Sequence, residues 1–305
     1  MRSGAPLRRK QVYPGAIVDG HPVRDSLLVR LRSRLQSALV SSGERDEGEV
    51  ERLLRSAPGV TRANTVAVAS PKGGVGKTTS AFLVGNLLAS HQKLRVVAVD
   101  ANPDFGTLAD LAPDAKRSER SLSDLLADLD GLTTAAQLRP YVSPVPSGLH
   151  LLGAPRDAQA MAAVTPEQYG RLLAFLSMFY EVVVLDLGTG LTAPLARFVL
   201  DRADQLVLVT TPEWVTAQLV LAALDHVEHE RTTVLLNKAS ARVPLDHRML
   251  EERFRHERLH RSIVLPYDEQ LQVMLDTGTY SIEALQRRVR LPVKQLALAV
   301  SEQLV

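Results

Sequence analysis

The sequence predicts an α/β fold: a doubly wound, mainly parallel sheet of seven or eight strands with helices on both faces. Two observations support this prediction. From Thr65 onward, short runs rich in Val and Leu alternate with longer stretches of helical periodicity, which is the order that a parallel sheet with crossover helices requires. The short runs are apolar throughout, as expected for strands that are covered on both faces.

The composition is that of a soluble globular protein. The chain of 305 residues is 45% hydrophobic and 23% charged, a balance that supplies enough apolar surface for a large core. No apolar run approaches the ~20 residues that cross a bilayer, and the basic N-terminus lacks the apolar stretch of a signal peptide. Cysteine is absent, which excludes disulfides, thiolate metal ligands and cysteine nucleophiles. We therefore expect a cytoplasmic protein.

Residues 1–62 are predicted to form a basic, partly helical extension ahead of an α/β domain at residues 63–305. Residues 1–24 contain scattered Gly and Pro without periodicity, which is typical of a mobile arm. Leucines at helical spacing predict a helix over residues 25–40, and a second short helix is expected near residues 49–56. The first 36 residues hold eight basic and two acidic side chains. This arm is therefore a candidate for contact with a nucleic acid, an anionic membrane or an acidic partner.

The strands and helices of the α/β domain are expected in alternation. Strands are predicted at residues 65–70, 95–100, 149–153, 182–186, 205–210, 232–237 and 262–265. Helices are predicted at residues 78–90, 121–129, 166–179, 193–203, 215–226 and 246–255. After Ser281, apolar residues at spacings of three and four predict a helical stripe that faces the core. Pro292 is expected to split this stripe into two helices.

A glycine-rich loop between the first strand and the first helix carries the strongest functional signal. It reads Ala69-Ser70-Pro71-Lys72-Gly73-Gly74-Val75-Gly76-Lys77-Thr78-Thr79. Glycines allow backbone N–H groups to curl around an anion, and a helix N-terminus adds partial positive charge. Lys77 is expected to reach the β- and γ-phosphates of a nucleotide, and the Thr78 hydroxyl to ligate Mg²⁺. Pro71 stands where an ordinary phosphate loop has its first glycine, and Lys72 is an additional lysine.

The run from Lys72 to Thr79 resembles the deviant phosphate loop of the MinD/ParA family of P-loop ATPases, which includes cell-division, partition and secretion-associated members. The resemblance covers about residues 65–304. It implies that ATP or ADP, with Mg²⁺, is bound by Lys72, Gly73, Gly74, Val75, Gly76, Lys77, Thr78 and Thr79. It also implies a homodimer with ATP sandwiched between the subunits, in which Lys72 reaches the nucleotide of the partner. The switch sequences look most like those of actinobacterial members, some of them associated with type VII secretion.

Acidic residues at two strand ends are candidates for the metal site. The resemblance implies that Asp100 lies near the metal and its waters, and that Asp186, the Walker B position, holds Mg²⁺ through water. Where the family has a second Asp that orients the attacking water, this chain has Asn102. An amide can bind water but lacks the negative charge that activates it, so hydrolysis is expected to be slow. Asp104 is the nearest carboxylate that could substitute; alternatively, Asn102 caps a turn before Pro103.

Two further strand ends are candidates for binding the base. The resemblance implies that Asn237 reads the adenine edge and that the loop Pro266-Tyr267-Asp268 packs on the base. All of these motifs fall at the carboxyl ends of predicted strands, where ligands bind in such sheets. A helix-capping role for Asn237 is the alternative.

Together these signals predict an ATP-binding, slowly hydrolysing dimerisation switch that positions or partitions a cargo: DNA, a secretion apparatus or another large assembly. An unidentified protein partner or activator is expected. The alternative is a hydrolysis-deficient ATP-binding scaffold that acts through protein partners. A metabolic enzyme on the same fold is a further rival, although a metal-cluster carrier would need the cysteines that this chain lacks.

Three surface features bear on the partner. Arg287, Arg288, Arg290 and Lys294 lie off the C-terminal stripe and form either a nonspecific DNA contact or a solvated polar face. Trp214 lines a dimer or partner surface, or packs in the core. The C-terminus lacks a basic, aromatic-rich amphipathic end, which disfavours a C-terminal membrane anchor. Recruitment to the nucleoid, or to a complex at the cell pole or membrane, would then depend on the partner.

Overall fold

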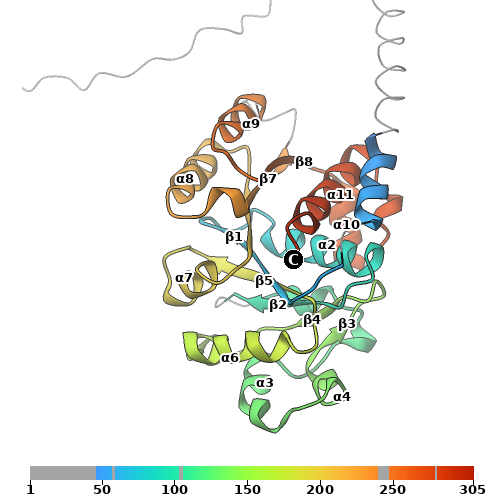
Figure 1. Ribbon diagram of the computed structural model, residues 1–305, viewed down its shortest axis with the longest axis vertical. Coiled ribbons are helices and arrows are strands. Elements are labelled where there is room, and N and C mark those ends of the chain that lie inside the picture. Colours follow the sequence, from blue (N-terminus) through green and yellow to red (C-terminus); the bar gives the residue numbers. More distant parts are fainter. Residues whose placement is uncertain (1–45, 57–58, 103–105, 240–246, 279) are drawn as a thin grey trace, which may run out of the picture. The chain divides into compact units, whose positions relative to one another are not determined.

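The computed structural model describes residues 46–56, 59–102, 106–239, 247–278 and 280–305 (Figure 1). The chain divides into two units at residue 45, and the second unit spans Asp46–Val305. The predicted arm and the helix expected over residues 25–40 lie outside the described residues. The second short helix is present over residues 46–55 and belongs to the same unit as the α/β domain.

One eight-stranded sheet forms the centre of this unit, with the strand order β3-β4-β2-β5-β1-β6-β7-β8. The strands are β1 (Asn64–Ser70), β2 (Val96–Ala101), β3 (Ser143–Pro144), β4 (His150–Leu152), β5 (Val182–Thr189), β6 (Gln205–Thr210), β7 (Thr232–Ala239) and β8 (Arg261–Pro266). All neighbours pair in parallel except β3 and β4. All seven predicted strands are therefore confirmed. The additional strand β3 has two residues, too few to leave a pattern in the sequence.

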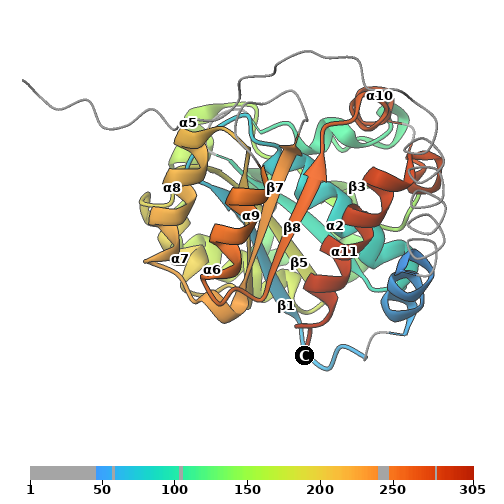
Figure 2. The same ribbon diagram turned by 90° about the horizontal axis from the view of Figure 1, so that it is seen from above.

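Helices cover both faces of the sheet (Figure 2). One face packs against α2 (Lys77–His91), α10 (Glu269–Thr277), α11 (Arg287–Ser301) and the helix over residues 46–55. The other face packs against α3 (Leu122–Asp128), α6 (Pro166–Leu176), α7 (Pro194–Leu200), α8 (Trp214–Leu224) and α9 (His247–Arg255). Short helices α4 (Ala135–Leu138) and α5 (Ala158–Ala162) lie in connections. The predicted doubly wound fold is confirmed, with helix ends shifted by up to three residues.

Each buried strand supplies side chains to both layers, as its apolar sequence requires. In β1, Val66 and Val68 contribute to the core under α2 and α11, whereas Ala67 and Ala69 contribute to the core on the opposite face. This alternation follows from the two-residue period of a strand. Among the helices that the structure describes, none is both long and apolar enough to span a bilayer.

The predicted split of the C-terminal stripe at Pro292 is wrong, because α11 runs unbroken through this residue. Pro292 is the sixth residue of the helix, so its missing N–H removes one hydrogen bond next to a first turn whose N–H groups have no helical partner in any case. Val289, Val293 and Leu296 are at most 1% exposed. Their burial on the sheet offsets the cost of the proline.

Two of the basic residues of α11 fit neither of the two interpretations offered for them, a DNA contact or a solvated face, because carboxylates hold both. Lys294 has a side chain that is only 3% exposed, and its Nζ lies 2.6 Å from Glu51 Oε2 and 2.9 Å from Glu283 Oε1. Arg290 Nε lies 2.5 Å from Glu47 Oε1. These contacts attach the helix over residues 46–55 to α11. The two cations are therefore not available to a DNA backbone.

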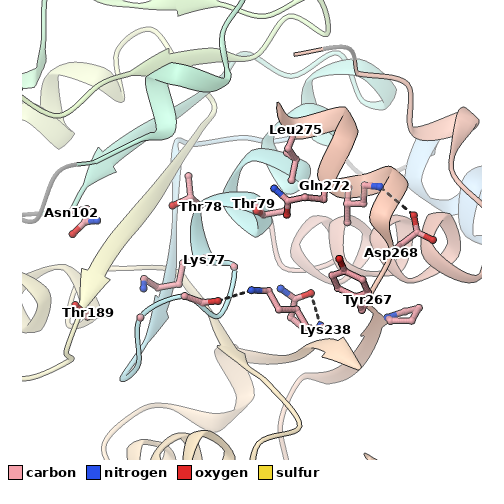
Figure 3. A pocket seen from close by; sticks show the side chains of 16 residues that line it. Lys77, Thr78, Thr79, Asn102, Thr189, Lys238, Tyr267, Asp268, Gln272 and Leu275 are labelled. Carbon is pink, nitrogen blue, oxygen red and sulfur yellow. Dashed lines mark hydrogen bonds between the residues drawn. The ribbon is translucent and has the colours of Figure 1, made fainter. Parts of the chain in front are cut away.

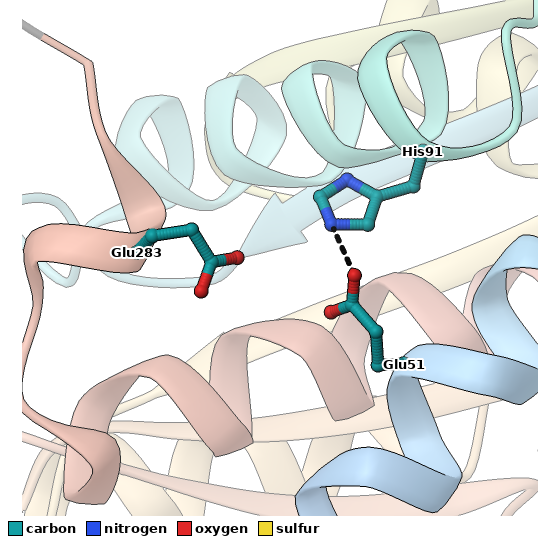
Figure 4. A group of neighbouring side chains, drawn as sticks. All are labelled: Glu51, His91 and Glu283. Carbon is teal, nitrogen blue, oxygen red and sulfur yellow. Dashed lines mark ion pairs between the residues drawn. The ribbon is translucent and has the colours of Figure 1, made fainter.

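The same cluster extends to the end of α2 (Figure 4). Glu51 Oε1 lies 3.4 Å from His91 Nε2, and one ligand atom each from Glu51, His91 and Glu283 lies within 4.8 Å of the others. Such a set could hold a metal ion, but the Lys294 ammonium already contacts both carboxylates. We therefore interpret the cluster as an ion-pair network around the buried Lys294.

Candidate nucleotide site

A cavity of about 430 Å³ opens at the carboxyl ends of the central strands (Figure 3). The phosphate loop and the start of α2 form one side, and the segment after β8 together with α10 forms the other. The lining residues are Gly73, Gly74, Gly76, Lys77, Thr78, Thr79, Asn102, Thr189, Asn237, Lys238, Pro266, Tyr267, Asp268, Leu271, Gln272 and Leu275. The structure thus brings residues from all the predicted motifs to one edge of the sheet.

The phosphate loop requires glycine at two places. Gly74 and Gly76 have φ values of 73° and 98°, in the left-handed region that other residues rarely adopt. A Cβ atom at Gly76 would also lie 2.2 Å from Asn237 Nδ2. Gly76 is the N-cap of α2, where no side chain caps the helix and no acidic residue occupies the first turn. The free N–H groups at the start of α2 can therefore bind an anion.

Lys77 and Thr78, the first residues of α2, lie where the sequence predicts them. Lys77 is 9% exposed and lines the cavity. Burial lowers the pKa of its ammonium, and the nearby Asp186 carboxylate opposes this shift. Thr78 Oγ1 donates a hydrogen bond of 2.5 Å to Asp186 Oδ2. The hydroxyl and the carboxylate predicted to hold the metal are thus already in contact.

Asp186 is a buried carboxylate whose hydrogen bonds are incomplete. It is 1% exposed, and within the described part of the chain its Oδ1 has no hydrogen-bond partner. Burial raises its pKa to about 7; the hydrogen bond from Thr78 opposes the shift, and the charge of Asp100 adds to it. Oxygen ligands of this kind suit Mg²⁺, which prefers carboxylates and hydroxyl or water oxygens. The residues present therefore fit the metal that the sequence implies.

Asp100 lies directly across from Asp186 in the parallel pairing of β2 with β5. Its oxygens accept hydrogen bonds from the backbone N–H groups of Asn102 (3.2 Å) and Leu108 (3.0 Å). Burial raises its pKa to about 6, although these backbone hydrogen bonds lower it. In this structure Asp100 therefore holds the backbone at Asn102 and Leu108, a role that sequence reasoning did not assign to it.

Of the two residues predicted to orient the attacking water, the structure describes Asn102 but not Asp104. Asn102 lines the cavity, on the side where Thr189 lies and away from Tyr267 (Figure 3). Asp104 lies outside the described residues, and its proposed substitution for a missing carboxylate stays a prediction.

Lys72 is directed away from the cavity that its own loop lines. Its Nζ lies 2.6 Å from Glu213 Oε2, at the N-cap of α8, and Lys72 is absent from the cavity lining. Glu213 also accepts a hydrogen bond of 3.1 Å from Thr216 Oγ1. The hydrogen bond from Lys72 is the largest cause of the lowered pKa of Glu213. Sequence reasoning missed Glu213, because no local pattern marks it.

The base side of the cavity differs in part from the expectation. Tyr267 is 53% exposed and lines the cavity, as predicted. Asp268 is held by structural contacts: its Oδ1 accepts from the backbone N–H of Leu271 (3.2 Å), and its Oδ2 lies 3.0 Å from Arg288 Nη2. It thus caps α10 and fixes the loop rather than facing a base freely. Gln272 of α10 completes this wall and was not predicted.

Asn237 contacts the phosphate loop. Its Nδ2 donates a hydrogen bond of 2.7 Å to Val75 O, and its Oδ1 accepts one of 2.8 Å from the backbone N–H of Lys238. The helix-capping alternative is wrong, since the next described helix begins only at His247. Its predicted role at the adenine edge stays a prediction.

An apolar surface lies next to Glu213. Trp214 is 53%, Val215 64% and Leu219 43% exposed, and all three belong to α8. The core-packing alternative for Trp214 is therefore wrong.

Comparison with known proteins agrees with this geometry. Residues 66–142 match the family of CobQ/CobB/MinD/ParA nucleotide-binding domains. The chain carries a MinD/ParA-type nucleotide-binding domain. The fold of this domain is similar to that of the septum site-determining protein MinD from Pyrococcus horikoshii, solved as a complex with Mg-ADP: the TM-score is 0.60 at 18% identity, over 77% of this chain and 94% of that one.

Two curated relatives of the MinD/ParA-type domain differ in their described roles. The ESX-1 secretion-associated protein EspI of Mycobacterium tuberculosis is 28% identical over 248 residues, which are 78% of this chain but 36% of EspI. The chain thus spans about a third of that relative. The chromosome-partitioning ATPase Soj of Thermus thermophilus is 32% identical over 176 residues, covering 56% of this chain and 64% of Soj.

Proposed function

We propose that this chain binds ATP with Mg²⁺ and uses the γ-phosphate to close a homodimer, which slow hydrolysis reopens. The observation that carries the proposal is a cavity with groups for an anion, next to a buried carboxylate that contacts its lining residue Thr78. The uncapped start of α2 and Lys77 supply positive charge for phosphate. The buried Asp186, with one oxygen that lacks a hydrogen-bond partner among the described residues, supplies negative charge for a cation.

Thr78 and Asp186 are the residues that would hold Mg²⁺, since their oxygens are already 2.5 Å apart. Bound there, the metal would neutralise the charge on the phosphate oxygens. The chain itself contributes the phosphate loop, which positions the triphosphate, and Lys77, whose ammonium stabilises its negative charge. Asn102 lines the same cavity and would orient a water molecule without activating it as strongly as a carboxylate.

Two surface features support a dimer that depends on ATP. Lys72 projects away from its own cavity toward α8, so its ammonium is placed to serve a second subunit. The exposed apolar side chains Trp214, Val215 and Leu219 begin directly after Glu213, the residue that holds Lys72. Apolar side chains grouped on one helix are typical of protein interfaces. A γ-phosphate that binds only the closed state would shift the population toward it.

The cargo is more consistent with a protein assembly than with DNA. Arg290 and Lys294 are paired with carboxylates of the helix over residues 46–55. Arg287 and Arg288 also have carboxylate partners, in Glu47 and Asp268, so the charge of the basic group that a DNA contact would use is largely neutralised. The likeness to EspI extends over 78% of this chain. We therefore propose that the switch acts on a secretion apparatus or another large protein complex.

The experiment that tests this function measures nucleotide binding and mass in parallel. Analytical ultracentrifugation with Mg²⁺ and either ATP or ADP should give a dimer with ATP alone. Lys72→Ala should bind nucleotide but stay monomeric, whereas Lys77→Ala should lose nucleotide binding because the phosphates lose their main cation. Lys116→Ala, at an exposed lysine of a 3-10 helix, is the control. Absence of ATP binding, or equal dimerisation with ADP, would contradict the proposal.

A hydrolysis-deficient scaffold remains the second candidate, and the amide at Asn102 is the observation that favours it. Phosphate release over many turnovers separates the two functions, because a scaffold would bind ATP and dimerise without releasing phosphate.

A further inference from the structure

Two consecutive residues near the end of β7 both contact the phosphate loop, and Figure 3 labels the second of them, Lys238. Asn237 Nδ2 donates a hydrogen bond of 2.7 Å to Val75 O, and Lys238 Nζ donates one of 2.7 Å to Gly74 O. We propose that Asn237 and Lys238 form a clamp that fixes the phosphate loop in its anion-binding shape before a nucleotide arrives, with Lys238 as a positioning residue. This inference rests on the proposed nucleotide site and deepens it.

The backbone at this point is distorted in the way such a clamp requires. Successive side chains of a regular strand point to opposite faces of the sheet, so two neighbours would not normally reach the same loop. Lys238 has a φ of 56°, in the left-handed region, and the register of β7 with β8 shifts between Leu236 and Ala239. These two irregularities bring both side chains to the loop.

A left-handed non-glycine residue costs free energy and persists only where its surroundings hold it. At Lys238 the holding contacts are its own hydrogen bond to the loop and the one from its backbone N–H to Asn237 Oδ1. The contacts with the phosphate loop therefore help to offset the free-energy cost of the left-handed backbone at Lys238. This coupling favours a functional clamp over an ordinary irregular strand end.

The clamp determines where the loop N–H groups point. In a planar trans peptide, the C=O of one residue and the N–H of the next point in opposite directions. Holding the carbonyls of Gly74 and Val75 toward Asn237 and Lys238 therefore turns the N–H groups of Val75 and Gly76 away from them. Backbone N–H groups arranged in this way are the donors that a glycine-rich loop offers to phosphate. The loop is thus pre-organised, and binding need not supply the free energy of ordering it.

The test compares Lys238→Met, which keeps the length of the side chain but removes the donor, with Lys238→Arg, which restores a donor and the charge. Hydrogen exchange of the Val75 and Gly76 amides in the nucleotide-free protein reports on the loop directly. Lys238→Met should accelerate this exchange several-fold and weaken ADP binding about tenfold, the loss expected for one hydrogen bond from a charged donor. Lys238→Arg should recover most of both effects. Lys116→Met is the matched control.

Inorganic tripolyphosphate separates a phosphate clamp from a contact with the base. If Lys238 acts on the loop, Lys238→Met should lower the affinity for tripolyphosphate and the affinity for ADP by the same factor. A loss confined to ADP would show that Lys238 contacts the base and would overturn the clamp. Unchanged amide exchange in Lys238→Met, at a thermal unfolding midpoint close to that of the parent, would also overturn it. If the parent protein bound neither ADP nor ATP, the proposed function would fail, while the exchange measurement on the empty loop would still decide on the clamp.

Discussion

Asn102 lines the cavity, and under the proposed function it stands where a carboxylate would activate the attacking water. Asn102→Asp keeps the size of the side chain and adds the missing negative charge, so basal ATP turnover should rise about a hundredfold, at the lower end of the range of general base catalysis. Phosphate release under multiple-turnover conditions measures this. An unchanged rate would mean that the amide does not limit hydrolysis. Asn237→Asp, which removes the donor to Val75 O, should lower nucleotide affinity without such a gain.

At this scale, the sequence alone could nominate a residue only where that residue belongs to a local pattern in the chain. Lys77, Thr78 and Asp186 were predicted because a phosphate loop and a strand end are local patterns. Glu213 and Lys238 were not assigned roles, since their contacts with the loop join residues 141 and 164 positions apart. Such contacts depend on the order of strands in the sheet, which no single motif specifies.

At the scale of elements, the helix over residues 46–55 is attached through a buried lysine. Lys294→Met would leave Glu51 and Glu283 without their shared cation. Lys294 is 3% exposed, but the two carboxylates are 23% and 63% exposed, so we expect a cost of about 2 kcal/mol, below that of a fully buried pair. Equilibrium denaturation by urea should show a fall of that size in the free energy of unfolding. Arg55→Met, which removes a largely exposed partner of Glu51, should cost less than about 1 kcal/mol. Equal effects would contradict an ion-pair network around the buried Lys294.

The same network makes the free energy of unfolding depend on pH in the acid range. Burial acts to raise the pKa of Glu51, but hydrogen bonds from Lys294 and Arg55 lower it from 4.5 to about 2. A carboxyl group with a lower pKa in the folded state stabilises the fold fully above the unfolded value and loses this contribution as the pH falls. The loss should therefore occur between about pH 4.5 and 2, and Glu51→Gln should flatten that part of the stability profile. The amphipathic stripe of α11 was predicted, whereas the burial of Lys294 was not, because it requires a helix from the other end of the sequence.

At the scale of the whole molecule, the contact of Lys72 with Glu213 sets the starting state for dimerisation. If this pair must open before Lys72 can serve a second subunit, Glu213→Gln should shift dimerisation to lower ATP concentrations. The pair is exposed, with side chains that are 42% and 62% accessible, so the gain should be at most about fivefold. Titration of the dimer by light scattering measures it, with Glu119→Gln as the control. Weaker dimerisation would mean that Glu213 itself contacts the partner.

The doubly wound fold was predictable as a whole because alternating apolar strands and helices leave few other topologies. The surface of α8 that a partner would cover was not predictable from the sequence. Trp214 has the same sequence signature whether it is buried or exposed, and only the packing of α8 on the sheet leaves it on the surface.

The exposure of Trp214 has a spectroscopic consequence, because it is the only tryptophan in the chain. Indole emission from this protein therefore arises at a single point, one residue from Glu213. Emission in the free protein should have the long wavelength of a water-exposed indole, since 53% of the residue is accessible. A subunit that covered α8 would shift the emission to shorter wavelength. The unlabelled protein can thus report, in real time, how fast its own surface is covered after ATP is added and how long it stays covered.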